Sequence, residues 1–291
     1  MTFRPDAKLD PGQVRDVRGS RLGGTGGLAL GGGGLGTILI VALVLLSGGD
    51  LGDLIGLGVN APAQQGPVGS QAAAECDTGA EANERQDCRI VGTVNSLAAY
   101  WADAFAASNQ EFQQPEVVLF SDAVNTQCGG ATSAVGPFYC PLDQTIYIDL
   151  GFYDDLESRF GAEGGPFAEE YVLAHEYGHH VQNLLGLLQQ GTETGAEGTA
   201  VRTELQADCF AGVWGAHAVD TGFLQPITQD QIDQALNAAF VIGDDRIQET
   251  TQGQVNPETW THGSSEQRQA WFTSGIEGGS ADQCDTFNSD I

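Results

Sequence analysis

The sequence PFAEEYVLAHEYGHHVQNLLG, residues 166–186, predicts the helix around which the rest of the chain is organised. Pro166 suits the first turn of a helix, and Glu169 and Glu170 follow it at the end where the helix dipole favours negative charge. Gly186 is placed to end the helix. We therefore expect a helix over about residues 166–185.

Two histidines in this helix, His175 and His179, lie four residues apart and so share one face. Two imidazoles in this arrangement can bind one tetrahedral ion, and Glu176 points toward a metal-bound water. Zinc lowers the pKa of its water to about 7, and a carboxylate can accept the proton and pass it to a leaving amine. The pattern predicts a zinc site with Glu176 as general base and acid. The alternative is a solvated pair of histidines on an ordinary helix.

A third ligand must come from another element, and residues 202–214, RTELQADCFAGVW, offer Glu204 and Asp208 on a second expected helix. Glu204 would complete a site of two histidines and one glutamate with its fourth position open, while Asp208 would accept the ring N–H of a zinc-bound histidine. In so acidic a chain, the alternative is a solvated helix face. The apolar neighbours favour a face turned inward: Leu205, Ala207, Phe210, Val213 and Trp214.

The motif His-Glu-x-x-His followed by Glu-x-x-Ala-Asp resembles the gluzincin group of metallopeptidases. The stretches GPFYCP, DQTIYIDLGFYDDL, AHEYGHHVQNLLG, ELQADCFAGVW and THGSSEQR resemble the bacterial family named "putative neutral zinc metallopeptidase" over most of the chain. This resemblance implies that His175, His179 and Glu204 bind Zn²⁺ and that Glu176 is the catalytic carboxylate. It also implies a zincin-like fold in which the strand near residues 143–150 is an edge to which a peptide substrate adds in extended form.

Three further histidines differ in expected role. His262, in THGSSEQR, is predicted to be catalytic, donating a hydrogen bond or positive charge to the oxyanion of the tetrahedral intermediate, as a downstream histidine does in some gluzincins. The alternative is a loop histidine that caps the next helix. His180 projects about 100° away from its neighbour around the helix, so we expect it to pack or to support the site. His217 is expected to be structural.

The fold class predicted from the whole pattern is α+β. We expect a small antiparallel sheet packed on the helix that carries the two metal-binding histidines, and a mostly helical remainder that supplies Glu204. The apolar spacing around Val94 and Trp101 predicts an earlier amphipathic helix. Strands are expected at 117–120 and 143–150, and further helices at 199–220, 228–240 and 264–274.

The charged residues are unevenly distributed. The chain has 39 Asp and Glu against 11 Lys and Arg, which makes nucleic acid and anionic lipid poor partners for the folded part. Five of the 11 basic residues precede position 22, just before the uncharged apolar residues 28–46, LALGGGGLGTILIVALVLL. These 19 residues are about long enough to span a ~30 Å hydrocarbon layer, with the basic flank on the cytoplasmic side.

We therefore predict a single-pass protein of the cell membrane in four parts. They are a cytoplasmic segment (1–27), a transmembrane helix (28–46), a flexible linker (47–87) and an extracytoplasmic metallopeptidase domain (88–291). A cleaved signal peptide is the alternative, because basic and apolar regions also occur there in that order. An Ala-x-Ala-like cleavage site appears only at residues 61–63, well beyond the apolar run, which favours the membrane anchor.

All six cysteines follow the apolar run, and proximity suggests the pairs Cys76 with Cys88, Cys128 with Cys140, and Cys209 with Cys284. Six cysteines allow 15 connectivities. An even number beyond the apolar run suits an oxidising compartment.

The leading function is hydrolysis of peptide bonds in proteins or peptides outside the cytoplasmic membrane. One alternative is a catalytically weak surface protein in which zinc holds the fold together and the acidic exterior contacts partners. A purely structural site, however, needs no base such as Glu176 and normally closes its fourth position. The other alternative is a hydrolase of cell-wall peptides, which the same metal site would serve.

Overall fold

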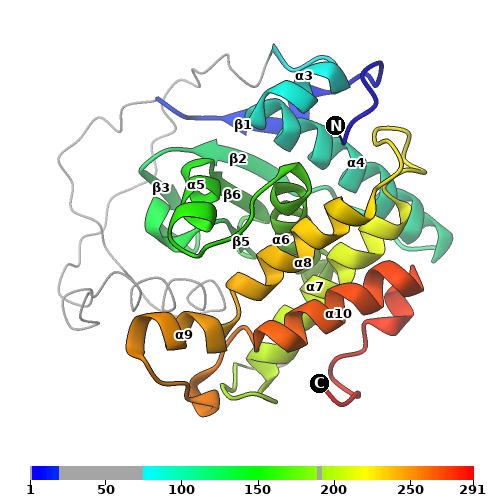
Figure 1. The fold of residues 1–291 in the computed structure, drawn as a ribbon. Coiled ribbons are helices and arrows are strands. Elements are labelled where there is room, and N and C mark those ends of the chain that lie inside the picture. The colour runs from blue at the N-terminus through cyan, green and yellow to red at the C-terminus, as the bar shows by residue number, and fades with distance from the viewer. Residues whose placement is uncertain (1, 20–74, 189–191) are drawn as a thin grey trace.

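The computed structural model describes residues 2–19, 75–188 and 192–291, and these residues form a mostly helical α+β structure (Figure 1). The strands are β1 (Val14–Asp16), β2 (Glu116–Phe120), β3 (Ala123–Thr126), β4 (Gly129–Thr132), β5 (Phe138–Cys140) and β6 (Thr145–Asp149). The helices are α3 (Gly79–Glu84), α4 (Gln86–Ala107), α5 (Gly151–Ser158), α6 (Pro166–Leu184), α7 (Thr199–His217), α8 (Gln229–Val241), α9 (Asp244–Gln252) and α10 (Ser265–Gly278). The predicted α+β class and the helical remainder are confirmed.

The prediction of an antiparallel sheet is wrong, because two of the three strand pairs in the four-stranded sheet are parallel. The four-stranded sheet has the order β1-β2-β6-β5, in which β2 is parallel to both β1 and β6 and only β5 is antiparallel to its neighbour. The alternation of side chains along β6 misled the prediction, because every residue of that strand is buried. A strand covered on both faces is typical of parallel pairing.

The prediction that the strand near residues 143–150 is an edge is also wrong. In the structure β6 lies between β2 and β5, so both of its sides are already paired. The outer strands of this sheet are β1 and β5. Sequence spacing gave no information on this order, because strand neighbours are set by long-range pairing.

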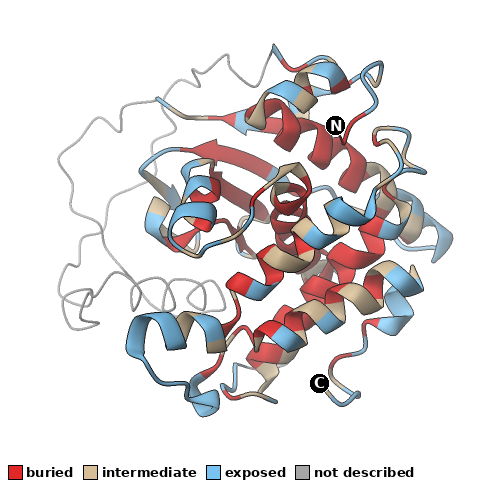
Figure 2. Cartoon of the chain, in the orientation of Figure 1, coloured by how far each residue is buried: buried red, intermediate tan, exposed pale blue. Residues whose placement is uncertain are grey.

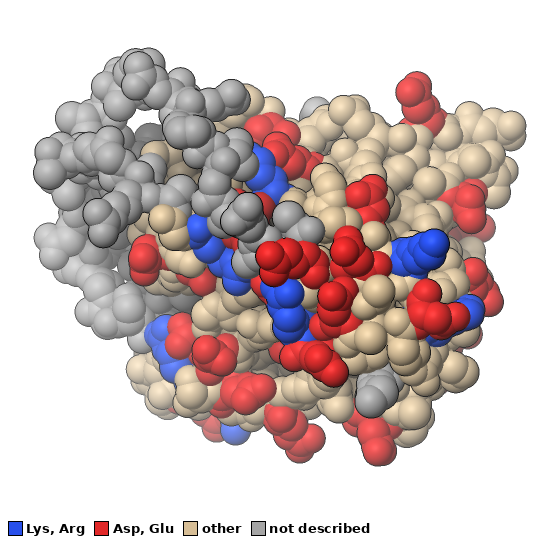
Figure 3. Space-filling model, turned by 90° about the horizontal axis from the view of Figure 1, so that it is seen from above, with Lys and Arg blue, Asp and Glu red and all other residues tan. Residues whose placement is uncertain are grey.

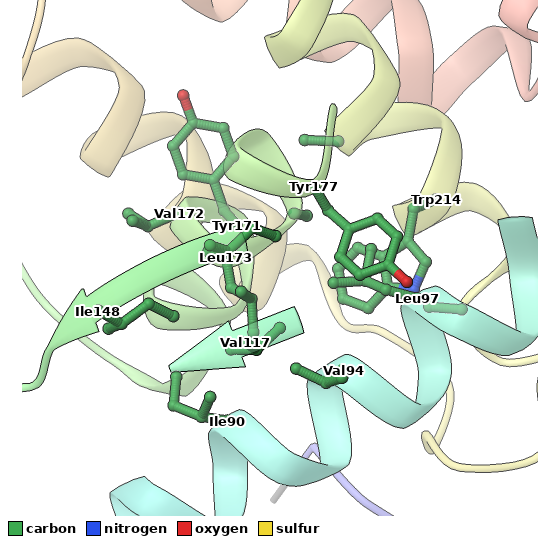
Figure 4. Packing of buried hydrophobic residues seen from close by; sticks show 14 of the residues in the cluster. Ile90, Val94, Leu97, Val117, Ile148, Tyr171, Val172, Leu173, Tyr177 and Trp214 are labelled. Atoms are coloured by element: carbon green, nitrogen blue, oxygen red, sulfur yellow. The ribbon is translucent and has the colours of Figure 1, made fainter. Parts of the chain in front are cut away.

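One hydrophobic core joins the sheet to the helices. Ile90 and Val94 of α4, Val117 of β2 and Ile148 of β6 are fully buried, and they meet Leu173 of α6 in this core (Figure 4). Burying one such side chain contributes roughly 1.5–3 kcal/mol. The core therefore fixes α6 against the sheet, and α6 in turn packs against α7 and α8.

The N-terminal residues belong to this folded unit, which differs from the predicted separation of residues 1–27. The Phe3 side chain is fully buried and lies so close to Gly92 that a Cβ there would come within 2.6 Å of its ring. Residues 14–16 form β1 at the side of β2. If residues 28–46 cross a membrane once, residues 2–19 and 88–291 lie on opposite sides and cannot make these contacts.

The predicted linker also ends earlier than expected. Residues 79–84 form α3, whose N-cap Thr78 and Glu81 make a capping box, and Cys76 is bonded to Cys88. Ordered structure therefore includes residues 75–87, which were assigned to the linker. The predicted transmembrane helix lies outside the described residues. Within the ranges that are described, no helix is both long enough and apolar enough to cross a bilayer.

The cysteine pairing suggested by proximity is the pairing in the structure: Cys76–Cys88, Cys128–Cys140 and Cys209–Cys284. The third pair closes the longest loop, with a sequence separation of 75 residues, and ties the C-terminal tail to α7. Most residues of α6 and α7 are buried, whereas α9 is largely exposed (Figure 2). The face of the molecule shown in Figure 3 carries many Asp and Glu side chains and few Lys and Arg side chains.

Candidate metal centre

Helices α6 and α7 carry the predicted metal ligands, and they pack unusually close together. Gly178 faces α7, and a Cβ built there would lie 3.0 Å from both Cα and the carbonyl oxygen of Ala207. A contact this short is tighter than most Cβ contacts in proteins, so glycine permits this approach without displacing the backbone of Ala207. The close approach brings the face of α6 that bears His175 and His179 next to Glu204 on α7.

The three predicted ligands converge. His175 Nε2 lies 3.1 Å from Glu204 Oε2, and His179 Nε2 lies 3.5 Å from Glu204 Oε1. All three side chains are buried, and one donor atom of each lies within 4.8 Å of the others. Donor atoms about 2.1 Å from a tetrahedral ion are roughly 3.4 Å apart, so these residues fit a zinc ion.

Asp208 orients His175. His175 Nδ1 lies 2.7 Å from Asp208 Oδ1, which also accepts a hydrogen bond of 2.6 Å from the Tyr171 hydroxyl. Arg268 donates to both oxygens of Asp208, from Nε at 2.9 Å and from Nη2 at 3.0 Å. The structure thus places Asp208 where the sequence predicted it, behind a ligand.

The electrostatics of this group follow from burial and charge. Burial raises the pKa of Asp208, but the charges of Arg268 and His175 outweigh it and bring the pKa to about 2. Burial lowers the pKa of His175, but Asp208 and Glu204 raise it to about 10. A proton on this imidazole is therefore favoured in the metal-free centre, and a bound zinc ion would take the place of that proton on Nε2, because a histidine ligand must be neutral.

Sequence reasoning missed Arg268 and Tyr171. Arg268 ends the motif THGSSEQR, and Tyr171 lies one turn before His175 on the predicted helix. The available signal was the rarity of cations: a single arginine inside a motif of a chain with only 11 basic residues has a good chance of pairing with a buried acid.

Glu176 lies next to the first ligand and is buried, and its Oε2 has no hydrogen-bond partner among the residues described. Burial raises its pKa, while the charges of His179 and His175 act in the opposite direction. A carboxylate with a raised pKa and a free oxygen is suited to accept and return a proton.

His262 also reaches the centre from a distant part of the chain. Its Nδ1 lies 3.2 Å from Asp244 Oδ1, and the pKa of His262 is raised, because Asp244 and Glu204 together outweigh the effect of burial. Its Nε2 is buried and has no partner in the described part of the chain. The cap of α10 is Ser264, so His262 does not fill the capping role that was its alternative.

Asp244 was not predicted, and it fixes the loop that holds His262. Its Oδ2 accepts hydrogen bonds from the backbone N–H groups of Thr261, His262 and Gly263, at 2.7, 2.7 and 3.1 Å. The carboxylate of Asp244, the first residue of α9, thereby fixes the positions of both the backbone and the ring of His262. No sequence pattern linked these positions, which are 18 residues apart.

The other two histidines lie in packing positions. His180 Nδ1 is 3.0 Å from the Tyr139 hydroxyl, and its Nε2 is 2.6 Å from the carbonyl oxygen of Gln113. Burial lowers the pKa of His180 to about 4, so the ring is neutral. His217 Nε2 contacts the carbonyl oxygen of Gly279 at 2.8 Å, and its ring stacks on Tyr100. Both ring nitrogens of His180 and Nε2 of His217 are therefore engaged by groups other than the three ligands.

Together these features define an α+β protein with a buried centre of two histidines and one glutamate, beside a free glutamate oxygen and a free imidazole nitrogen. A family model described as "Putative neutral zinc metallopeptidase" matches residues 3–287. The chain belongs to this family.

Relatives extend the likeness over the full length. An uncharacterized protein of Escherichia coli (strain K12) is 40% identical over 303 aligned positions, which cover 99% of this chain and 100% of that protein. An uncharacterized protein of Mycobacterium tuberculosis (strain H37Rv) is 53% identical over 225 positions, covering 74% of this chain and 75% of that protein. No solved structure matches this chain.

Proposed function

We propose that this chain is a zinc-dependent endopeptidase that hydrolyses peptide bonds of proteins or peptides outside the cytoplasmic membrane. The observation that carries the proposal is the convergence of His175, His179 and Glu204 beside the unpartnered oxygen of Glu176. Membership in the zinc metallopeptidase family supports it. A purely structural zinc site has no use for the buried carboxylate of Glu176.

The residues take complementary parts in this proposal. His175, His179 and Glu204 hold the ion, and when bound, zinc supplies a Lewis acid that polarises a carbonyl and lowers the pKa of water to about 7. Glu176 accepts a proton from the attacking water and passes it to the nitrogen of the leaving amine. His262 Nε2 donates a hydrogen bond to the oxygen on which negative charge develops.

The position of the substrate is part of the proposal. Because β6 is an inner strand, an extended peptide that adds to this sheet must pair with an outer strand. The outer strand β5 is tied to α6, since the Tyr139 hydroxyl contacts both His180 and Asn183. We therefore assign the substrate-pairing role to β5 in place of residues 143–150.

The location outside the cytoplasm rests on the three disulfides, which persist in oxidising compartments. Residues 2–19 pack on the domain, and this contact supports placing these residues on the same side of the membrane as the catalytic residues. Attachment to the cell membrane through residues 28–46 remains part of the proposal, but not as a single crossing, because that would separate residues 2–19 from the domain on which they pack.

The test compares the purified full-length protein with Glu176→Gln in two assays, zinc content by elemental analysis and cleavage of casein. We expect about one zinc in both proteins and a loss of cleavage by about 10²–10⁴-fold in the variant. Zinc in both without cleavage by the wild type favours the structural role or a narrow specificity such as cell-wall peptides. A wild type that binds no zinc contradicts the proposal.

A further inference from the structure

His179 is oriented by a route different from that of His175. Its Nδ1 lies 2.8 Å from Oε1 of Gln182, one turn later on α6. Gln182 Nε2 donates to the carbonyl oxygen of Thr203 at 2.7 Å and to Oε1 of Gln206 at 3.1 Å, both on α7. Gln206 Nε2 then donates to the carbonyl oxygen of Cys284 at 2.8 Å.

We propose that the side chains of Gln182 and Gln206 form an amide relay, which positions His179 for metal binding and links it to Cys284 in the C-terminal tail. This inference rests on the proposed function, because it assigns a role toward the same metal. Both glutamines are buried, Gln182 completely, so water does not compete for these hydrogen bonds. Neither side chain is charged at any pH, so the relay acts through hydrogen-bond direction.

The direction of the relay is set by backbone groups at two points. The carbonyl oxygens of Thr203 and Cys284 can only accept, so each must face the NH₂ side of a glutamine. The oxygen of Gln182 is then left facing His179, and it can only accept as well. His179 must therefore carry its proton on Nδ1, which leaves the lone pair of Nε2 facing Glu204 and the metal position.

A disulfide bond also ties the C-terminal tail to α7, the helix that carries Gln206. Cys284 is bonded to Cys209, one residue after Asp208, so the partners that orient both histidines are fixed on the same turns of α7. Gln206 and Asp208 act on different rings, the first through Gln182 and the second directly. The disulfide holds the Cys284 carbonyl in place, and that carbonyl fixes the amide of Gln206.

The test measures zinc affinity of the full-length protein by competition with a chromophoric chelator, after metal removal. Gln182→Met keeps the size of the side chain and removes the acceptor, so we expect affinity to fall about 10–100-fold. Gln206→Met leaves the Thr203 contact intact, so we expect a smaller loss. Gln269→Met is the matched control, since Gln269 contacts the carbonyl oxygen of Leu236 and no residue of the centre.

A fourth variant separates positioning from general stability. Gln182→Glu restores an acceptor for His179 but places an anion against the oxygens of Thr203 and Gln206. We expect thermal unfolding of the metal-free protein at a lower temperature than for Gln182→Met, together with higher zinc affinity. If the role of Gln182 is only structural, affinity will follow stability across the variants.

The outcomes distinguish the two proposals. Equal zinc affinity of the wild type and Gln182→Met overturns the relay and leaves the proposed function intact. Affinity that falls in parallel with stability, including in Gln182→Glu, overturns it too. A wild type that binds no zinc contradicts the proposed function and, with it, the role of the relay.

Discussion

Buried polar atoms without partners occur at several places in the described residues, and two of them belong to residues of the candidate metal centre. Within the described residues, Glu176 Oε2 and His262 Nε2 are both buried and unbonded beside the three metal ligands. Leaving such an atom unpaired costs about 1–3 kcal/mol. We infer that these two atoms gain hydrogen-bond partners when a ligand or substrate binds at the centre, which offsets this free-energy cost.

The first prediction at this scale concerns His262. His262→Gln removes the imidazole, and we expect kcat to fall about 10²-fold or more while zinc content and KM change little, because the developing negative charge loses its donor. In the wild type, the protonated donor form should be lost as pH rises through the raised pKa of His262. Steady-state kinetics at several pH values, with zinc analysis, measure both effects.

A loss of zinc in His262→Gln would instead assign His262 to the support of the metal ligands. His217→Gln serves as the control, since that ring lies away from the ligands and contacts Gly279.

The second prediction concerns Glu170, a fully buried carboxyl on α6 with no hydrogen-bond partner for either oxygen among the residues described. Burial raises its pKa well above 4.5, and the charge of Arg89 offsets only part of the effect. Above pH 4.5 the native state keeps a proton that the unfolded state has released, so stability falls by about 1.4 kcal/mol per pH unit up to the native pKa.

Glu170→Gln removes this dependence, so the variant should be more stable than the wild type at neutral pH, and the difference should grow as the pH rises above about 5. Chemical denaturation at several pH values measures it. Glu169→Gln is the control and should not stabilise, because Glu169 is paired with Arg89 at 2.8 Å. A constant difference across this range would show that Glu170 is not protonated in the native state.

At the scale of elements, the spacing of α6 and α7 decides whether the centre forms. Gly178→Ala improves helix propensity by about 1 kcal/mol, but its Cβ meets the backbone of Ala207. We expect the helices to move apart, with a net loss of stability and weaker zinc binding, as Glu204 is displaced from the histidines.

A matched glycine on α7 provides the comparison. At Gly215 the nearest atom to an added Cβ is Ile276 Cδ1 at 3.4 Å, an ordinary contact, so Gly215→Ala should be neutral or stabilising by up to about 1 kcal/mol. Thermal unfolding and zinc titration of both variants test the pair. If Gly178→Ala is as well tolerated as Gly215→Ala, the close approach does not control the site.

At the scale of the whole molecule, the contacts of the N-terminal residues make a prediction about topology. Residues 2–19 pack on the same unit as the centre, so an exposed position in each should face the same compartment. We expect Asp6→Cys and Leu142→Cys to react equally with a membrane-impermeant maleimide on intact cells. Leu142 is 65% exposed and provides the reference for the catalytic domain.

Labelling of Asp6→Cys only after cell lysis would restore the original prediction of a cytoplasmic N-terminal segment. It would also mean that β1 does not pair with β2 in the cell. Labelling of neither before lysis would contradict the proposed location of the domain outside the cytoplasm.

Local patterns in the sequence were sufficient for α6 and for the grouping of its side chains. The predicted helix at 166–185 is α6 at Pro166–Leu184, and a spacing of four residues was enough to place His175 and His179 on one face. Glu204 and Asp208 were found in the same way, because residues four apart on α7 also share a face. Disulfide partners close in sequence followed from proximity.

Only the tertiary structure decided what depends on contacts between distant segments. Strand order and direction, the docking of residues 2–19, and the approach of Arg268, Asp244 and the Gln182–Gln206 pair to the ligands all join residues far apart in the chain. Helical periodicity reports which residues share a face, since it arises from local geometry. It carries no information about which other face lies opposite, because that is set by packing of the whole core.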